Sequence, residues 1–337
     1  MTIEAVKLKI GKSCALETVY FSGGLKGWPT DRGWALFPVS ADPNSDALVF
    51  SDQSAHFQYA TQECQLKFIG ACVHYEVNEN LPQMDIWESG NRDPQNGLNA
   101  ADSWSAVGHQ AALQGDKEYA NCATYVSVCL RVAGLRLRDI SNKYHAQLNW
   151  ALLSKKKPGR WFSNAALLDL YADFHSLMSE LSSTRDYLAK IAAIHAGAPE
   201  RVDSLARLED WISKSSNRSC ASQPLVHLLL SASGTKESPG WLRRLGDIRN
   251  EMLHKIPMGA NERVSGLTLE EINTSLGAIT TIRLAEPMNK TPLDKQPPDP
   301  LRELSELSAH LERLCRAGWK MAKYPAELPC VIGKSAI

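Results

Sequence analysis

Hydrophobic positions follow two different rhythms along this chain. In the first 80 residues they fall in short runs, rich in β-branched and aromatic residues, which Gly, Pro, Asn and Asp separate. This pattern is typical of strands. It predicts strands at residues 6–10, 16–22, 34–39, 48–51 and 66–77. We therefore expect a mixed sheet in the N-terminal part of the protein.

The pattern changes to a helical one after residue 103. Residues 89–103 consist largely of turn-forming residues and have no apolar period, so they predict an exposed loop. Between residues 116 and 133, apolar side chains recur every three or four positions, which predicts an amphipathic helix facing a core.

A domain boundary is predicted at Ser154–Arg160, where four cations surround a Pro-Gly pair. A solvated linker is the preferred interpretation of this cluster, and contact with an RNA backbone is the alternative. The division gives a mixed α/β N-terminal domain of unknown role over residues 1–153 and a helical domain over residues 160–325.

The second domain is predicted to be a bundle of four or five helices. Its first helix is long, begins at a cap at Ser163 or Asn164, and ends at Gly197. The other helices are predicted at residues 205–212, at 225–230, from a cap at Ser238 and Pro239 to just before Pro257, and at 301–319. The segment 266–283 is ambiguous, because Leu267–Ile272 suits a helix start and Ile279–Leu284 alternates like a strand. The predicted fold class is α+β.

Charge and targeting signals narrow the possible partners. Lys plus Arg and Asp plus Glu number 37 each, so no whole-chain field attracts nucleic acid, and any such contact must be local. The first ten residues lack the apolar core of a signal peptide, and no segment approaches the length of a membrane helix. We expect a cytoplasmic protein without a membrane partner.

The eight cysteines form no regular framework, so reduced thiols are expected. Cys64, Cys72 and His74 are the nearest approach to a set of zinc ligands, but they lack the usual close pairing of two ligands. Buried core cysteines are the preferred interpretation. We therefore expect neither a metal nor a cofactor.

Chemistry is best supported at Arg249 and His254, five residues apart on one predicted helix. Arg presents a fixed fork of donors to phosphate oxygens, and His both accepts and donates protons near neutrality. Asn250 adds an amide that can hold the imidazole or a ribose hydroxyl. Positions i and i+5 lie about 7.5 Å apart along an ideal helix and about 140° apart around it. We therefore expect a neighbouring helix or a second subunit to complete the site.

The run Arg249-Asn-Glu-Met-Leu-His254 resembles the motif of the HEPN superfamily, whose ribonucleases carry an Arg, four to six residues and a His late in a small helical bundle. The resemblance covers roughly residues 160–325. It implies a homodimer that cleaves single-stranded RNA without metal, as a toxin or antiphage effector, with an antitoxin or regulatory protein as a further partner. It also implies that His254 is the acid or base at the ribose 2′-hydroxyl, that Arg249 neutralises the phosphate, and that Asn250 orients one of them.

One position departs from that family. Its toxins that pair with a nucleotidyltransferase antitoxin often carry a Tyr two residues after the His, as the site of modification, whereas this chain has Ile256. We do not expect silencing by that route.

Other interpretations of these residues remain. Arg249 can be a surface cation paired with Asp247 or Glu251, and His254 a histidine favoured by the helix dipole. The bundle can also be a non-catalytic dimerisation or RNA-binding module next to a sensing N-terminal domain. Residues 1–150 show no phosphate loop, nucleophile elbow or metal spacing, which disfavours a separate enzyme there.

Overall fold

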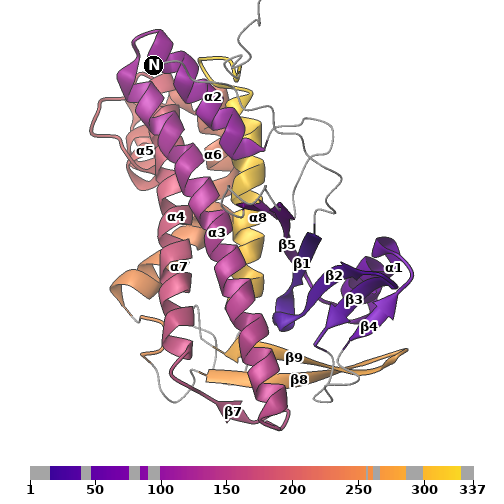
Figure 1. The fold of residues 1–337 in the computed structure, drawn as a ribbon. Helices are drawn as coiled ribbons and strands as arrows, with labels where there is room; N and C mark the ends of the chain where they lie inside the picture. The colour runs from indigo at the N-terminus through magenta and orange to yellow at the C-terminus, as the bar shows by residue number, and fades with distance from the viewer. Residues whose placement is uncertain are drawn as a thin grey trace, which may run out of the picture. The chain divides into compact units, whose positions relative to one another are not determined.

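The first part of the chain forms an antiparallel sheet of six strands, in the order β4-β3-β2-β1-β5-β6 (Figure 1). The computed structural model describes residues 16–38, 47–75, 84–89, 99–255, 257–260, 266–285 and 299–327. The strands are β1 (Leu16–Phe21), β2 (Lys26–Thr30), β3 (Gly33–Phe37), β4 (Leu48–Phe50), β5 (Phe68–Tyr75) and β6 (Met84–Ser89). Short helical turns lie between them: η1 (Ser22–Gly24), α1 (Gln53–Gln58) and η2 (Tyr59–Glu63).

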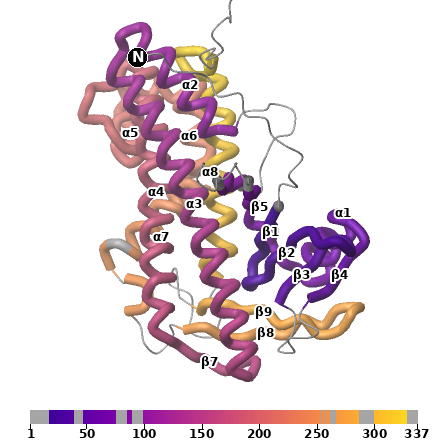
Figure 2. Tube along the Cα trace, in the orientation of Figure 1, coloured from indigo at the N-terminus to yellow at the C-terminus, as the bar shows by residue number. Residues whose placement is uncertain are grey.

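Helices dominate the rest of the chain, which confirms the predicted α+β class. They are α2 (Ala100–Leu113), α3 (Lys117–Leu153), α4 (Leu167–His195), α5 (Leu205–Ser213), η3 (Ser215–Ser222), α6 (Pro224–Ser233), α7 (Trp241–His254) and α8 (Pro300–Trp319). A second sheet has three strands, β7 (Trp161–Phe162), β8 (Gly266–Thr274) and β9 (Gly277–Ala285). Figures 1 and 2 show α4, α7 and α8 side by side, and residues of each of these helices contact the other two.

The chain divides into two compact units. The sheet unit comprises residues 1–90, 144–158 and 269–282, and the helical unit comprises 91–143, 159–268 and 283–337. The chain crosses from the sheet unit to the helical unit between Pro158 and Gly159, inside the predicted linker. The other points at which it crosses between the units were not predicted. Helix α2 and the first part of α3 therefore belong with the helical unit, which is larger than the bundle predicted for residues 160–325.

Each unit has its own buried side chains. In the sheet unit, Phe21, Leu25 and Leu36 are buried together with Leu148 from the end of α3. In the helical unit, Trp104 of α2 is fully buried, and its indole Nε1 donates a hydrogen bond to the carbonyl of Cys315 in α8, at 3.0 Å. This bond satisfies the one polar atom of a large buried aromatic side chain.

Several predicted elements agree with the structure. The strands predicted at 16–22, 34–39, 48–51 and 66–77 correspond to β1, β3, β4 and β5, whereas the strand predicted at 6–10 lies outside the described residues. The five helices predicted after residue 160 correspond to α4, α5, α6, α7 and α8. Strands β2 and β6 and the short helix α1 were not predicted.

Other predictions need correction. The predicted loop 89–103 is wrong from Ala100 onward, because Asn99 caps α2 by accepting a hydrogen bond from the backbone of Asp102. The cap predicted at Ser163 or Asn164 is also wrong, since α4 begins after Ala166 without a side-chain cap bond. The ambiguous segment 266–283 forms strands, since it lies mainly in β8 and β9.

None of the helices in the described part of the chain has the length and apolar character needed to cross a membrane.

Candidate functional site

Helix α7 carries the three predicted site residues, Arg249, Asn250 and His254. It starts at Trp241 after the N-cap Gly240, so the predicted cap at Ser238 and Pro239 is displaced, and it ends before Pro257 as predicted. One side of the helix is buried through Leu242, Leu245, Ile248 and Met252. This spacing of three and four residues leaves Asn250 and His254 exposed and Arg249 half-buried at the edge.

Two arginines early in α7 fix the helix against its neighbours. Arg243 Nη2 lies 3.0 Å and 3.1 Å from the two carboxylate oxygens of Glu209 in α5. Arg244 forms an ion pair with Glu303 of α8, with its Nε 2.7 Å from the carboxylate. Both guanidinium groups therefore have a structural role, which agrees with the site being confined to the later turns of the helix.

Arg249 and His254 contact one another directly. Arg249 Nη1 lies 3.1 Å from His254 Nε2 and 3.3 Å from the amide oxygen of Asn250. Because a guanidinium only donates hydrogen bonds, His254 accepts at Nε2 and its imidazole is neutral in this arrangement. The two side chains therefore meet within one helix, while completion of the site by a neighbouring helix or a second subunit stays a prediction. The long Arg side chain spans the 140° separation within one helix.

Arg249 forms no ion pair with a carboxylate among the described residues. Glu251, one of its two predicted surface partners, binds Lys255 at 3.0 Å instead. The hydrogen-bond partners of Arg249 among the described residues are the imidazole and the amide, both uncharged. Since no described carboxylate binds this guanidinium, its donors suit an anionic ligand such as a phosphate.

A further cation lies beside this surface, on helix α4. A Cβ atom placed on Gly246 of α7 would lie 2.6 Å from Arg185 Nη1, so the Arg185 guanidinium passes directly over this glycine. Asn250 follows Gly246 by four residues, and therefore sits on the same side of α7, one turn later. Arg185 also binds Asp186, at 3.0 and 3.2 Å. Sequence reasoning missed Arg185, because only the packing of α4 on α7 brings it there.

The end of α7 is held by helix α4. The backbone N–H of Met258 donates to Nε2 of His175, at 3.2 Å, four residues beyond His254. Burial lowers the pKa of His175, which keeps its imidazole neutral and able to accept this bond. The turn after the helix is thereby fixed, and with it the position of the last turn that carries His254. Ile256 lies outside the described residues.

A second group of chemically active side chains lies in the sheet unit. Cys72, His74 and Asp85 form a cluster that could hold a metal ion. Of the ligands considered from the sequence, Cys64 is not in this cluster and is buried. Sequence reasoning missed Asp85, because only the pairing of β5 with β6 places it opposite His74.

Comparison of the chain with protein-family models, with curated proteins and with solved structures found no match in any of the three. The geometry of the described residues therefore carries the argument about function.

Proposed function

We propose that this protein is an endoribonuclease that cleaves single-stranded RNA at Arg249, Asn250 and His254 without a metal ion. The observation that carries the proposal is the 3.1 Å contact between Arg249 Nη1 and His254 Nε2, on a part of α7 where His254 and Asn250 are exposed. A neutral imidazole, and a guanidinium that has no carboxylate partner among the described residues, can supply the base and the charge-stabilising donors for phosphodiester transfer.

The reaction follows from what each group can donate or accept. When phosphate oxygens take the N–H groups of Arg249, Nε2 of His254 is released and accepts the proton of the ribose 2′-hydroxyl. The 2′-oxygen forms a bond to the adjacent phosphorus, and the bond from phosphorus to the 5′-oxygen breaks. The departing 5′-oxygen receives the proton from the imidazolium. The products are a 2′,3′-cyclic phosphate and a 5′-hydroxyl, and no water is consumed.

The remaining polar groups suit the binding of an extended RNA strand. Arg249 stabilises the charge that develops on the phosphate, and Asn250 keeps the guanidinium or a ribose hydroxyl in position. Arg185, over Gly246, adds a positive charge beside the same side of α7, with its side chain 12% exposed and paired with Asp186. DNA lacks the attacking 2′-hydroxyl, so it is expected to bind without being cut.

The biological role in this proposal rests on the resemblance to the HEPN superfamily. We place the protein among effectors that arrest growth by cutting RNA, acting as a homodimer and restrained by an antitoxin or another regulatory protein. The contact of Arg249 with His254 within one chain means that a second copy is not needed to assemble this pair. The dimer would instead extend the RNA-binding surface.

The decisive experiment compares wild type with Arg249→Ala and His254→Ala. Single-stranded RNA is incubated with each pure protein in excess chelator, and the product ends are identified. Each variant is expected to be slower by on the order of 10²-fold or more, because a positioned base and a charge-stabilising donor each contribute about that much. Expression in bacteria should arrest growth for the wild type alone.

Matched controls are available on the same unit. His227 on α6 and Arg218 in η3 are both exposed, so His227→Ala and Arg218→Ala remove the same groups away from the site and should keep wild-type rates. Equal cleavage by all five proteins, with circular dichroism unchanged, refutes the site. Binding of RNA by every protein with no cutting by any identifies the non-catalytic module instead.

A further inference from the structure

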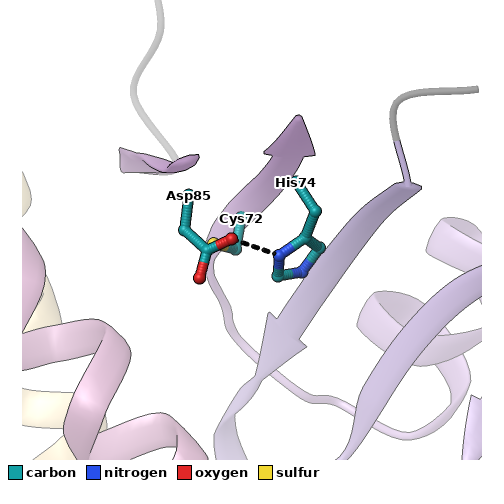
Figure 3. Close-up of side chains that lie close together, drawn as sticks. All are labelled: Cys72, His74 and Asp85. Atoms are coloured by element: carbon teal, nitrogen blue, oxygen red, sulfur yellow. Dashed lines mark hydrogen bonds and ion pairs between the residues drawn. The ribbon is translucent and has the colours of Figure 1, made fainter. Parts of the chain in front are cut away.

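Three potential ligand groups converge on one face of the six-stranded sheet. Cys72 and His74 are two residues apart on β5, so their side chains share a face, and Asp85 of β6 is paired directly opposite His74. One ligand atom from each residue lies within 4.8 Å of those of the other two. Figure 3 shows the Asp85 carboxylate facing the His74 ring, with the sulfur of Cys72 close behind that carboxylate.

The three ligand atoms, which lie within 4.8 Å of one another, can be compared with the ligands of a tetrahedral zinc site. Zinc bond lengths to sulfur, nitrogen and oxygen imply ligand atoms about 3.4 to 3.6 Å apart. His74 Nδ1 and Asp85 Oδ1 now lie 2.7 Å apart, joined by a hydrogen bond, so they need to separate by roughly 1 Å. Small side-chain rotations suffice for that, because the paired strands already fix the three backbone positions.

The orientation of His74 is set by Thr18. The hydroxyl of Thr18 on β1 lies 3.2 Å from His74 Nε2, the nitrogen that faces away from Asp85. A metal-bound histidine almost always donates its other ring N–H to an oxygen of this kind. Because a hydroxyl both donates and accepts, Thr18 can support the free histidine and the metal-bound one.

Access to the cluster favours an ion over a larger substrate. Cys72 is 1% exposed, whereas the side chains of His74 and Asp85 are 27% and 37% exposed. Trp87 is paired opposite Cys72, and its ring lies over Gly70, where an added Cβ would be 2.4 Å from the indole. The sulfur is thus the buried ligand of the site, and the imidazole and carboxylate are its more exposed ligands. The 1% exposure of Cys72 disfavours attack by its thiol on a bulky substrate, whereas a small cation needs little space.

Lys26 is a cation of the sheet unit that interacts with Cys72. Lys26 of β2 interacts electrostatically with Cys72, which raises the lysine's pKa, but burial outweighs this and lowers it to about 8. Lys26 also lies over the ring of Tyr20, with Nζ 5.0 Å from the ring centre.

We propose that Cys72, His74 and Asp85 bind one zinc-class divalent ion, oriented by Thr18. One thiolate, one imidazole and one carboxylate match the borderline-soft character of zinc and do not match magnesium or calcium, which prefer oxygen ligands alone. Three protein ligands leave a fourth position for water or an external ligand. This site is independent of the proposed RNA cleavage, whose groups are on α7.

The test uses the full chain, stripped with chelator and titrated with cobalt(II), which gives a near-ultraviolet charge-transfer band when a thiolate binds it. Wild type is expected to take up one ion per chain with this band, and zinc should displace it. Cys72→Ser should abolish the band. His74→Gln and Asp85→Asn should weaken binding by at least about tenfold, and Thr18→Val by roughly tenfold. Asp85 is exposed on an edge strand, so the isosteric Asp85→Asn tests the site without endangering the fold.

Matched substitutions away from the cluster separate this site from adventitious binding. Cys220→Ser, His109→Gln and Asp31→Asn change the same residue types at partly or fully exposed positions and should leave the titration unchanged. Absence of the band in wild type overturns the proposal, as does an equal loss in Cys220→Ser. Rapid alkylation of Cys72 without metal uptake would identify a reactive thiol in its place. RNA cleavage in chelator is a separate readout, so either proposal can fail alone.

Discussion

The two candidate sites of this protein differ in how their residues come together and in how much water surrounds them. Arg249, Asn250 and His254 are neighbours in sequence on one helix and lie at its surface. The Cys72–His74–Asp85 cluster needs the pairing of two strands, and its thiol is buried. In the first case one helix provides the geometry, and in the second the sheet provides it.

This difference extends to the ionisable groups around each site. Burial in the sheet unit lowers the pKa of His56 and of His145 to about 4, and that of Lys26 to about 8. The residues on α7 have no such enclosure, so their reactivity must come from mutual contact and from the bound ligand. The helical site is therefore expected to be sensitive to the shape of single side chains, and the sheet unit to pH.

After removal of the site residues themselves, the largest effect expected on the helical side is that of Arg249→Lys. The substitution keeps the charge but loses the planar fork that reaches both His254 and a phosphate. Cleavage of single-stranded RNA should slow by on the order of 10²-fold, as for removal of a charge-stabilising donor. Arg218→Lys is the matched control, and a rate within threefold of wild type for Arg249→Lys would show that charge alone is enough.

In the sheet unit, we expect a large loss of the free energy of unfolding when the pH is lowered. His56 is buried among the rings of Phe21, Trp34 and Phe50, and neither of its nitrogens has a hydrogen-bond partner in the described structure. Its folded pKa of about 4 is below the ordinary value of 6.5, so the unfolded chain binds the proton first. The contribution of neutral His56 to the free energy of unfolding is therefore fully present above about pH 6.5. It is lost as the pH falls toward 4, by up to about 3 kcal/mol.

Urea unfolding of wild type and His56→Leu at pH 7 and pH 4.5 measures this loss. The substitution changes packing at both pH values, so the informative quantity is the difference between them, which should be smaller in His56→Leu by about 2 kcal/mol. The exposed His109→Gln should behave like wild type. An unchanged difference in His56→Leu would mean that the buried imidazole does not resist protonation.

The helices were the most predictable part of the fold, and the reason is their length and regular period. Helix α3 shows where this failed, since only residues 116–133 were predicted although it continues to Leu153. Leu137, Ile140, Tyr144 and Leu148 continue the period and are buried. The basic run after residue 154 indicates a domain boundary, but it does not indicate that a helix continues up to it.

The strands were harder because burial removes their alternation. Residues 266–269 of β8 are all buried, and side chains alternate in exposure only afterwards, so the first half had no period of two. Strand β2 contains Gly27 and Pro29, both poor strand formers. For the sites the same limit holds: Arg249 and His254 could be found from spacing, whereas Asp85 and Arg185 depend on register and packing that spacing does not encode.

A smaller effect is expected when zinc binds the sheet unit. An ion that binds the folded chain stabilises it by RT ln(1 + [L]/Kd), which is about 1.4 kcal/mol at ten times the dissociation constant. Unfolding of the stripped protein should shift by this amount when zinc is added, and the shift should vanish in Asp85→Asn. Asp31→Asn should retain it. A shift that persists without Asp85 would assign the stabilisation to another site.

The smallest effect, and the one that best separates positioning from chemistry, is that of Gly246→Ala. Alanine favours the helix by up to about 1 kcal/mol over glycine, so α7 should become no less stable. Its methyl group, however, would lie 2.6 Å from Arg185 Nη1 and would displace that guanidinium while leaving Arg249 and His254 in contact. We expect RNA affinity to fall by several-fold, with the rate at saturating RNA nearly unchanged. An equal fall in RNA affinity and in the rate at saturating RNA would place Arg185 in the chemical step. No change in affinity or in rate would show that Arg185 does not bind RNA.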